Sequence, residues 1–246
     1  MAERQGEVGG GVGPAAGTAR PAADGGVGPA AAGGARPAAD RATAAGLLAG
    51  RRFLEVRFGG SGGQGVILMG VILALAATRD HRHVIQTQSY GPEARGGYSR
   101  SDVIISSRPV DYPQLLGIDL LVALSDEAAH RYAGMLKPAG VCIYDSEMVP
   151  DPPAFPCETF GIPFTQLALE QTGKAQTANI LTLGAVVGLT GVVSEGSLEK
   201  AVLSLVPKGS EEVNAKAMRF GLGLSAQEWR RWSENVLNVG QEVAGR

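Results

Sequence analysis

A run of glycines early in the chain, Gly59-Gly60-Ser61-Gly62-Gly63-Gln64-Gly65, constrains the fold more than any other feature of the sequence. The residues before it, 53–58, alternate apolar and charged side chains and are rich in strand formers. Apolar residues after it, from Val66 to Ala77, recur at helical spacing. A strand, a glycine turn and a helix in this order predict the start of a βαβ unit.

The glycine turn is a candidate site for a phosphate group. Glycines let the backbone turn sharply and approach a ligand without interference from Cβ atoms. The helix that follows directs unpaired N–H groups and the positive end of its dipole at the turn. Gly60, Gly62 and Gly65 also match the G-x-G-x-x-G spacing of dinucleotide-binding folds.

An independent Rossmann-type oxidoreductase that binds NAD or FAD is an alternative that the sequence weakens. Such folds usually place an acidic residue at the end of the second strand. Here the predicted second strand ends in 88–90, Gln-Ser-Tyr, without a carboxylate. Asp80 lies about 20 residues after Gly60, the usual spacing, but it precedes the strand. No Lys-Ser/Thr pair follows the glycines, so a P-loop nucleotidase is excluded.

Composition divides the chain into three parts. Residues 1–50 are rich in Ala, Gly and Pro, and the heptad Gly-Gly-Val-Gly-Pro-Ala-Ala begins at Gly10 and again at Gly25. Such a segment buries too little apolar surface to offset its chain entropy, so we predict a disordered tail, either a tether or a segment without function. We predict one folded domain over 51–223 and a helical C-terminal tail over 224–246.

Charge and cysteine content limit the class of function. A net charge of −2 gives no indication of a nucleic-acid partner, and no apolar run reaches the roughly 18 residues of a membrane-spanning helix. Cys142 and Cys157 are too few for a zinc site or an iron–sulfur cluster. The sequence leaves open whether they form a disulfide, although an intracellular protein usually keeps such thiols reduced. We therefore expect a cytoplasmic protein.

Strand and helix patterns alternate from the first strand to residue 222, which predicts an α/β fold. Alternation of this kind gives three αβα layers, with helices on both faces of a parallel or mixed sheet. The predicted strands after the first are 83–90, 98–106, 119–124, 141–144 and 158–162. The predicted helices after the first are 126–136, 164–171, 177–189, 197–205 and 211–222.

A second unusual stretch runs from Ser89 to Gly97 and contains one proline and several glycines, which predict a loop. Within it, Glu93 and Arg95 flank a small residue, close to the phenol of Tyr90. The loop either offers these groups to a ligand or a subunit, or holds a local surface ion pair worth about 0–1 kcal/mol. The residues alone leave both interpretations open.

The rest of the sequence shows no catalytic set. There are no paired acids, no Ser/His/Asp arrangement and no metal-ligand cluster. Asp102 and Asp145 are lone carboxylates beside strands and are predicted to be caps or turn residues. Arg100 has no partner at a useful spacing and is predicted either to be solvated at the surface or to form ordinary hydrogen bonds. The sequence thus predicts that the chain binds a phosphorylated molecule and that the chain has no catalytic groups of its own.

Both motifs resemble the gamma subunit of the 2-oxoacid:ferredoxin oxidoreductases. The resemblance rests on 60–66 after a strand and on 86–97, and it extends to 136–141 and to Ala178-Asn179-Ile180 at the start of a helix rich in small residues. The form Ser-Tyr-Gly-Pro-Glu-Ala-Arg-Gly-Gly is similar to the branch that acts on 2-oxoglutarate, with pyruvate and branched-chain relatives close to it.

The resemblance implies a subunit of an enzyme that converts a 2-oxoacid, coenzyme A and oxidised ferredoxin into acyl-CoA, carbon dioxide and reduced ferredoxin. It implies alpha, beta and, where present, delta subunits as partners, which hold thiamine diphosphate, magnesium and iron–sulfur clusters, with ferredoxin as the acceptor. This chain would then be inactive alone and supply no catalytic residue. A purely structural assembly subunit, in which the glycine turn only packs helix against strand, remains the other alternative.

Two sets of residues in this sequence take a role from the resemblance. The set expected to bind coenzyme A is Gly60, Gly62, Gly63, Gln64 and Gly65. The set expected to face the active site or a subunit interface is Tyr90, Glu93, Arg95 and Gly96.

Overall fold

The computed structural model describes residues 46–91, 97–224, 228–229 and 232. The described chain forms a six-stranded sheet in the order β2-β3-β1-β4-β5-β6. The strands are β1 (Phe53–Ser61), β2 (His83–Tyr90), β3 (Tyr98–Ser106), β4 (Ile118–Ala123), β5 (Leu136–Asp145) and β6 (Glu158–Ile162). The helices are α1 (Val66–Arg79), α2 (Asp126–Tyr132), α3 (Phe164–Thr172), α4 (Ala178–Thr190), α5 (Glu195–Leu205) and α6 (Glu211–Leu222), with short 3-10 turns at Ala133–Met135 and Ala175–Thr177.

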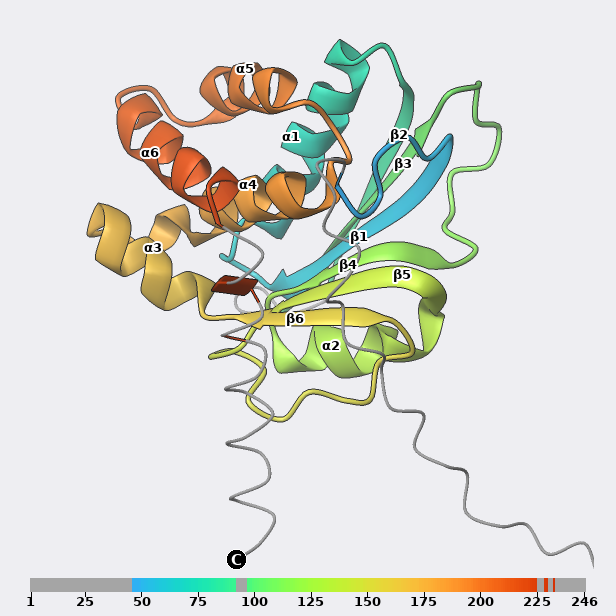
Figure 1. The fold of residues 1–246 in the computed structure, drawn as a ribbon, viewed down its shortest axis with the longest axis horizontal. Coiled ribbons are helices and arrows are strands. Elements are labelled where there is room, and N and C mark those ends of the chain that lie inside the picture. Colours follow the sequence, from blue (N-terminus) through green and yellow to red (C-terminus); the bar gives the residue numbers. More distant parts are fainter. Residues whose placement is uncertain (1–45, 92–96, 225–227, 230–231, 233–246) are drawn as a thin grey trace, which may run out of the picture. The chain divides into compact units, whose positions relative to one another are not determined.

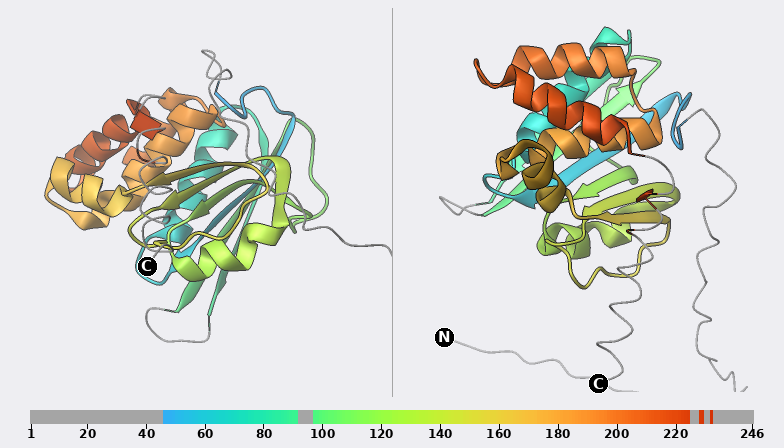
Figure 2. Two further views of the ribbon diagram at one scale, coloured as in Figure 1. Left: turned by 60° about the horizontal axis from the view of Figure 1, so that its bottom comes forward. Right: turned by 60° about the vertical axis from the view of Figure 1, so that its left-hand side comes forward.

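Helices cover both faces of the sheet, which confirms the predicted three-layer αβα architecture. α1, α4, α5 and α6 lie on one side of the sheet and α2 lies on the other (Figure 1). The further views in Figure 2 show the same division. The larger apolar core lies under α1 and includes Phe58 of β1 and Met69 of α1. The smaller core lies under α2 and includes Leu121 of β4 and Tyr132 of α2.

The sheet is mixed, and its antiparallel part changes the predicted βαβ unit. β1, β4, β5 and β6 run parallel, whereas β3 runs antiparallel to both β1 and β2. β2 therefore has the direction of β1, but β3 lies between them. The crossover through α1 thus skips one strand position, because the β2–β3 hairpin returns the chain to the side of β1.

Several predicted boundaries are shifted in the structure. β1 continues to Ser61 because its glycines pair with β3, Gly59 with Arg100 and Gly60 with Ser99, so residues 59–61 of the predicted turn are strand. The predicted helix over 126–136 ends earlier, at Tyr132, and a 3-10 turn follows it. β5 then begins at Leu136 and includes residues 138–140, which were predicted to end the helix.

The packed region reaches into segments predicted to be tails. Leu48 is 1% exposed and its N–H donates to the carbonyl of Thr190 at 2.9 Å. Trp229 is also buried and meets the ring of Phe160 edge-on, with 5.4 Å between the ring centroids. The division into a tail, a domain and a helical C-terminal tail stays a prediction, since residues 1–45 and 233–246 lie outside the described part.

Two properties of the described residues bear on the class of protein. None of their helices combines the length and the apolar character needed to cross a membrane. No three of their His, Cys, Asp and Glu side chains come together in a group that could hold a metal ion.

Candidate functional site

The predicted glycine turn is a tight turn at the end of β1. The N–H of Gln64 donates to the carbonyl of Ser61 at 3.2 Å, which closes a four-residue turn. Gly63 occupies the third position with φ +98°, as a type II turn requires. Gly65, with φ +74°, is the N-cap of α1, which begins at Val66. The backbone therefore leads directly from the sheet into the first turn of the helix.

The side chain of Gln64 holds this turn in place. Its Oε1 accepts from the N–H of Ser61 at 2.6 Å, and its Nε2 donates to the carbonyl of Leu124 at 2.7 Å. Leu124 follows β4, so the amide joins the ends of two neighbouring strands. The sequence predicted Gln64 as a ligand-binding residue; in the structure its amide positions the turn.

The turn lies where ligands bind in open α/β sheets. β1 and β4 are adjacent and parallel, yet α1 covers one face of the sheet and α2 covers the other (Figure 1). Crevices at the carboxyl ends of strands whose connections diverge in this way are the usual ligand sites of such sheets. The glycine turn follows β1, and residues 124–126 follow β4, so both lie at the carboxyl ends of these two strands.

The glycines of the turn serve two different purposes. A Cβ on Gly60 would lie 2.6 Å from Oε1 of Gln64, and a Cβ on Gly65 would collide with the amide of Asn179 at the start of α4. These two positions are therefore restricted by packing within the chain. A Cβ on Gly63 would meet nothing within 4 Å. Gly63 is thus the position at which an added side chain would enter open space beside the turn.

The structure brings the two sequence motifs together. The N–H of Gly62 donates to the carbonyl of Gly97, and the N–H of Gly91 donates to that of Tyr98, both at 2.7 Å. Gly97, at the end of the second motif, therefore lies against the glycine turn, and the second bond joins the two ends of that motif. Tyr90, at the end of β2, is 63% exposed. The other predicted members of this set, Glu93, Arg95 and Gly96, lie outside the described residues.

Asp80, the residue at the spacing expected of an NAD-binding acid, has a structural role. Its carboxylate accepts from the N–H and the hydroxyl of Ser194, both at 2.6 Å, and from the hydroxyl of Ser197, so it holds Ser194, the N-cap residue of α5, in place. Burial acts to raise the pKa of Asp80, but these hydrogen bonds outweigh it and lower the pKa. Asp80 is therefore already bound within the chain.

The lone carboxylates differ from each other. Asp145 accepts from the N–H of Glu147 at 3.0 Å and from the hydroxyl of Thr165 at 2.8 Å, which confirms the prediction of a turn or cap residue. Burial raises the pKa of Asp145 despite these bonds. The prediction for Asp102 was wrong, since it forms a buried two-bond ion pair with Arg57, each bond 2.7 Å long.

Sequence reasoning missed this pair because its partners lie on different strands. The antiparallel register places Arg57 of β1 directly opposite Asp102 of β3. The guanidinium of Arg57 also lies over the ring of Tyr132, 4.4 Å from its centroid. Charged residues that alternate with apolar ones along β1 were the available signal, because alternation assigns them to one face of the sheet.

A second set of charges lies at the other end of β1, where the carboxylates of Glu55 and Asp119 are buried and their cationic partners are partly exposed. Nζ of Lys137 lies 2.7 Å from Glu55 and 2.9 Å from Asp119, and Arg51 reaches Asp119 at 3.2 Å. Burial acts to lower the pKa of Lys137, but the two carboxylates outweigh it and raise the pKa. These charges link the beginning of β1 to β4 and β5, far from the glycine turn.

Both cysteines are free and buried. Burial raises the pKa of Cys142 well above its ordinary value and the pKa of Cys157 to about 11. The thiols are therefore protonated at neutral pH, which is typical of inert structural cysteines.

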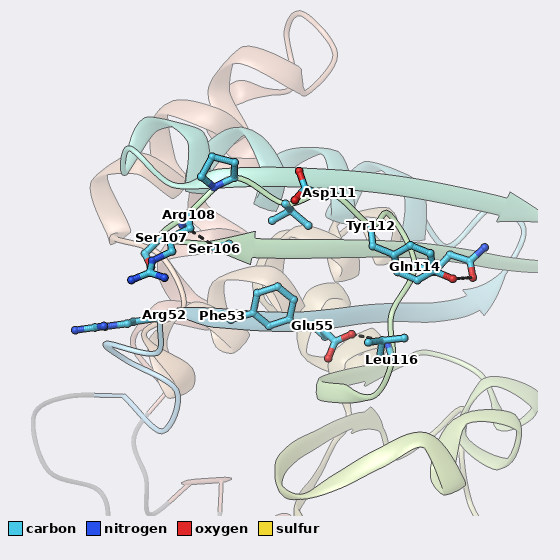
Figure 3. Close-up of a pocket in the computed structure, with 12 residues that line it drawn as sticks. Arg52, Phe53, Glu55, Ser106, Ser107, Arg108, Asp111, Tyr112, Gln114 and Leu116 are labelled. Carbon is cyan, nitrogen blue, oxygen red and sulfur yellow. Dashed lines mark hydrogen bonds between the residues drawn. The ribbon is translucent and has the colours of Figure 1, made fainter.

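A pocket of about 550 Å³ lies on the α2 side of the sheet, at the end of β1 remote from the glycine turn (Figure 3). Phe53, Tyr112 and Leu116 contribute apolar surface to it, and Arg52 and Arg108 contribute charge. It does not include any residue of the predicted coenzyme A set. The pocket is therefore distinct from the carboxyl ends of β1 and β4, where the glycine turn lies.

Comparison with known proteins places the chain in a family. The family model for pyruvate ferredoxin/flavodoxin oxidoreductase matches residues 55–224. The 2-oxoglutarate synthase subunit KorC of Methanocaldococcus jannaschii is 46% identical over 170 residues, which are 68% of this chain and 91% of that protein. Subunits named for ketoisovalerate and pyruvate match at 31–34% identity.

Solved structures agree with this placement. The gamma subunit of a keto/oxoacid ferredoxin oxidoreductase from Geobacter sulfurreducens is 46% identical, with a TM-score of 0.61 over 69% of this chain and 96% of that one. The 2-oxoglutarate:ferredoxin oxidoreductase of Magnetococcus marinus shares the fold at 23% identity, with a TM-score of 0.62 over 75% of this chain and 32% of that one. The chain therefore belongs to the pyruvate ferredoxin/flavodoxin oxidoreductase family, as a gamma subunit of the 2-oxoacid:ferredoxin oxidoreductases.

Proposed function

We propose that this chain is the gamma subunit of a complex that oxidises 2-oxoglutarate, forms succinyl-CoA and carbon dioxide, and reduces ferredoxin. The choice of 2-oxoglutarate is supported by identity, which is 37–46% to subunits named for 2-oxoglutarate and 31–34% to those named for ketoisovalerate or pyruvate. The form of the second motif supports the same branch.

The glycine turn is the proposed contact for coenzyme A. The single observation that carries this assignment is its place at the divergence of α1 and α2, with open space beside Gly63. Backbone N–H groups at the start of a long helix suit a pyrophosphate, and coenzyme A contains one. The related enzyme of Magnetococcus marinus was solved with 2-oxoglutarate, coenzyme A and succinyl-CoA bound, which supports this class of ligand.

The residues of this chain would bind and orient coenzyme A. When bound, it supplies the thiol that accepts the acyl group. The N–H groups of the first turn of α1 would hold the phosphates, and Gly63 would leave room for them. Gln64 would keep the turn closed through Ser61 and Leu124. None of these roles is a proton transfer or a bond-breaking step.

The remaining chemistry is assigned to other chains of the complex. Alpha, beta and, where present, delta subunits would hold thiamine diphosphate, magnesium and the iron–sulfur clusters, and ferredoxin would accept the electrons. The exposed phenol of Tyr90, beside the glycine turn, is proposed to face a partner subunit or the shared active site. We expect the complex in the cytoplasm and the isolated chain to be inactive.

A purely structural role for the turn is the second candidate, and one observation favours it. Packing inside the chain explains Gly60 and Gly65 without any ligand. Under this alternative the glycines only let α1 and α4 approach the end of β1. Gly63 distinguishes the two candidates, because its surroundings set no such restriction.

Steady-state kinetics of the reconstituted complex test the proposal. Gly63→Asp places a negative charge beside the turn, and Gly63→Asn places an uncharged side chain of the same shape there. We expect the Asp variant to raise KM for coenzyme A at least about tenfold more than the Asn variant, with KM for 2-oxoglutarate unchanged. Gly173→Asp is the remote control, since Gly173 also has a positive φ, +70°, and open space around it.

Equal KM values for coenzyme A in the Asp and Asn variants would contradict the assignment. Loss of partner subunits from the Gly63→Asp complex, without a change in KM for the fraction that assembles, would support the structural alternative. Oxidation of 2-oxoglutarate by the isolated chain would overturn its role as a dependent subunit.

A further inference from the structure

The strand β2 forms one edge of the sheet, and among the described strands only β3 pairs with it. The pairing runs along the whole strand, His83–Tyr90, in an unbroken register. α1 packs on one face of β2, yet every side chain of the strand is at least partly exposed. In Figure 1, α2 lies away from β2, beneath the β4–β5 part of the sheet. β2 therefore presents a row of backbone N–H and C=O groups along its outer side.

β2 has none of the sequence features that usually protect an edge strand. Such strands are commonly short, or they contain lysine, proline or a β-bulge. β2 is eight residues long, includes no Asp, Glu, Lys, Arg or Pro, and shows no register shift against β3. The other edge strand, β6, is five residues long, begins with Glu158 and is flanked in sequence by Pro156 and Pro163. The contrast identifies β2 as the edge that another strand can extend.

Hydrogen bonds to β3 identify the residues of β2 whose backbone groups point outwards. The N–H of Gly91 donates to the carbonyl of Tyr98 at 2.7 Å, and this pair continues the register of β2 with β3 by one residue. Bonded pairs alternate with non-bonded pairs in an antiparallel ladder, so every second residue before Gly91 also bonds to β3. The residues between them direct their N–H and C=O groups away from the sheet, and they are Val84, Gln86, Gln88 and Tyr90.

The outward residues of β2 match those of a second β2. When the two strands lie antiparallel with Thr87 opposite Thr87, residue 84 opposes 90 and residue 86 opposes 88. Each outward residue then bonds to another outward residue. A register shifted by two residues in either direction leaves at least one of the four without such a partner. The geometry of β2 thus selects one register against itself.

The side chains are compatible in this register. Threonine opposite threonine is a favourable cross-strand pair, whereas like charges directly opposite each other are unfavourable. The only side chain of β2 that can become positively charged near neutral pH is His83, and it would lie opposite Gly91. No like charges therefore meet along the paired strands.

α1 leaves room for the second copy. It packs against β1, β2 and β3, so it lies over the middle strand of these three, β3. Strands are about 4.8 Å apart, so the two α1 helices of a joined sheet would lie about 14 Å apart. Helices that pack directly against each other are about 8–10 Å apart, so the two copies of α1 would not collide.

We propose that β2 is a self-association edge, at which the β2 strands of two copies pair antiparallel about Thr87 and join the two sheets into one. The self-matching register is what selects a second copy of this chain, because a strand from a different protein would have no reason to match it. The proposal goes beyond the function proposed above and does not depend on it, since no residue of the glycine turn takes part.

Disulfide cross-linking of the full-length chain tests the register. Both native cysteines are buried, so a cysteine introduced at the edge is the reactive one. Thr87→Cys should form a covalent dimer under mild oxidation, because residues opposite each other in a non-bonded pair have Cα atoms about 4.5 Å apart, within the range of a disulfide. Gln88→Cys is the matched control. Gln88 is more exposed than Thr87 but opposes residue 86, so its dimer should form at least about tenfold more slowly.

Proline at position 88 tests whether the outer backbone groups make the contact. Gln88 directs its N–H outwards, so a proline there blocks the edge and keeps the bonds to β3. Gln88→Pro, added to the Thr87→Cys chain, should slow dimer formation at least about tenfold. Gln88→Ala retains the N–H and should leave the rate unchanged. Circular dichroism of both double variants verifies that they fold.

The outcomes separate this inference from the proposed function. Equal rates for Thr87→Cys and Gln88→Cys would overturn the paired edge and leave the proposed function intact, as would a Gln88→Pro variant that dimerises at the unchanged rate. Amides of β2 that become protected from hydrogen exchange only after partner subunits are added would assign the edge to those subunits and contradict the proposal. If Gln88→Pro does not fold, the comparison of the two cysteine variants decides.

Discussion

The two faces of the sheet are built from different interactions, although the same strands supply both. On the α1 side, β1 presents Leu54, Val56 and Phe58 to a continuous apolar core. On the α2 side, the alternate residues Glu55 and Arg57 are buried in ion pairs. Apolar contacts can be exchanged with little loss when volume is kept, whereas a buried charge requires its own partner.

The two sides also differ in how the described helices cover them. The α1 side has several helices above it and is closed within the chain. The α2 side has one short helix, a pocket and donors without acceptors. The first side therefore holds the larger apolar core, and the second side depends on buried ion pairs. Four changes test this contrast, from the largest expected effect to the smallest.

Truncation of one phenylalanine on each face of β1 should give the largest difference. Phe58 is 0% exposed and Phe53 is 47% exposed. Phe58→Ala should lower the free energy of unfolding by about 3–5 kcal/mol, because it leaves a cavity in the larger core. Phe53→Ala should lower it by less than about 1 kcal/mol. Urea denaturation of the two variants measures both values, and equal losses would contradict the assignment of the faces.

Removal of one partner from the buried ion pair should lower the free energy of unfolding by about 3 kcal/mol. Asp102→Leu leaves Arg57 buried without its carboxylate, which is strongly destabilising. The double variant Arg57→Met with Asp102→Leu should recover most of the loss, because apolar residues replace both charges. Denaturation of the single and double variants checks this. A double variant as unstable as the single one would show that packing, not the missing partner, determines the loss.

Addition of one methyl group at Gly65, as in Gly65→Ala, should lower the free energy of unfolding by about 2 kcal/mol or more. The new Cβ collides with the amide of Asn179 and is added to a residue with φ +74°. Gly173→Ala controls for the backbone strain, since Gly173 has a similar φ of +70° and open space. A larger fall in Tm for Gly65→Ala than for Gly173→Ala is expected. Equal falls would show that contact with α4 is unimportant.

The cap of α5 should give the smallest effect, and one that depends on pH. The pKa of Asp80 is lower in the folded protein than its ordinary value of 3.8. The contribution of Asp80 to the free energy of unfolding is therefore fully present at pH values above 3.8. This contribution is lost as the pH falls through the lower pKa that Asp80 has in the folded protein. Asp80→Asn should therefore be less stable than the unchanged chain at pH 6, and the difference should shrink towards pH 2. A difference independent of pH would contradict this role.

Interactions local in sequence were predictable, and those between strands were not. The periodicities of Val66–Ala77 and of 98–106 identified α1 and β3, and the fold class followed from their alternation. The pairing of Arg57 with Asp102 depends on the register between β1 and β3, and no residue near either one indicates that register. The chain order also concealed that β3 lies between β1 and β2.

The candidate site shows the same limit. Glycine spacing located the turn, because backbone conformations of this kind are restricted mainly to glycine. It did not distinguish Gly63, which faces open space, from Gly60 and Gly65, which packing restricts. The internal bonds of Gln64 depend on Leu124, distant in sequence. The roles assigned to Glu93, Arg95 and Gly96 stay predictions, because these residues lie outside the described part.

Hydrogen–deuterium exchange of the assembled complex, with and without coenzyme A, tests the central claim most directly. Amides of Gly63 and of residues 65–68, at the glycine turn and the first turn of α1, should exchange more slowly when coenzyme A is bound, because these N–H groups would hold its phosphates. The remote loop around Gly173 should be unchanged. Unchanged exchange rates at Gly63 and residues 65–68, in a complex that demonstrably binds coenzyme A, would contradict the assignment of the glycine turn.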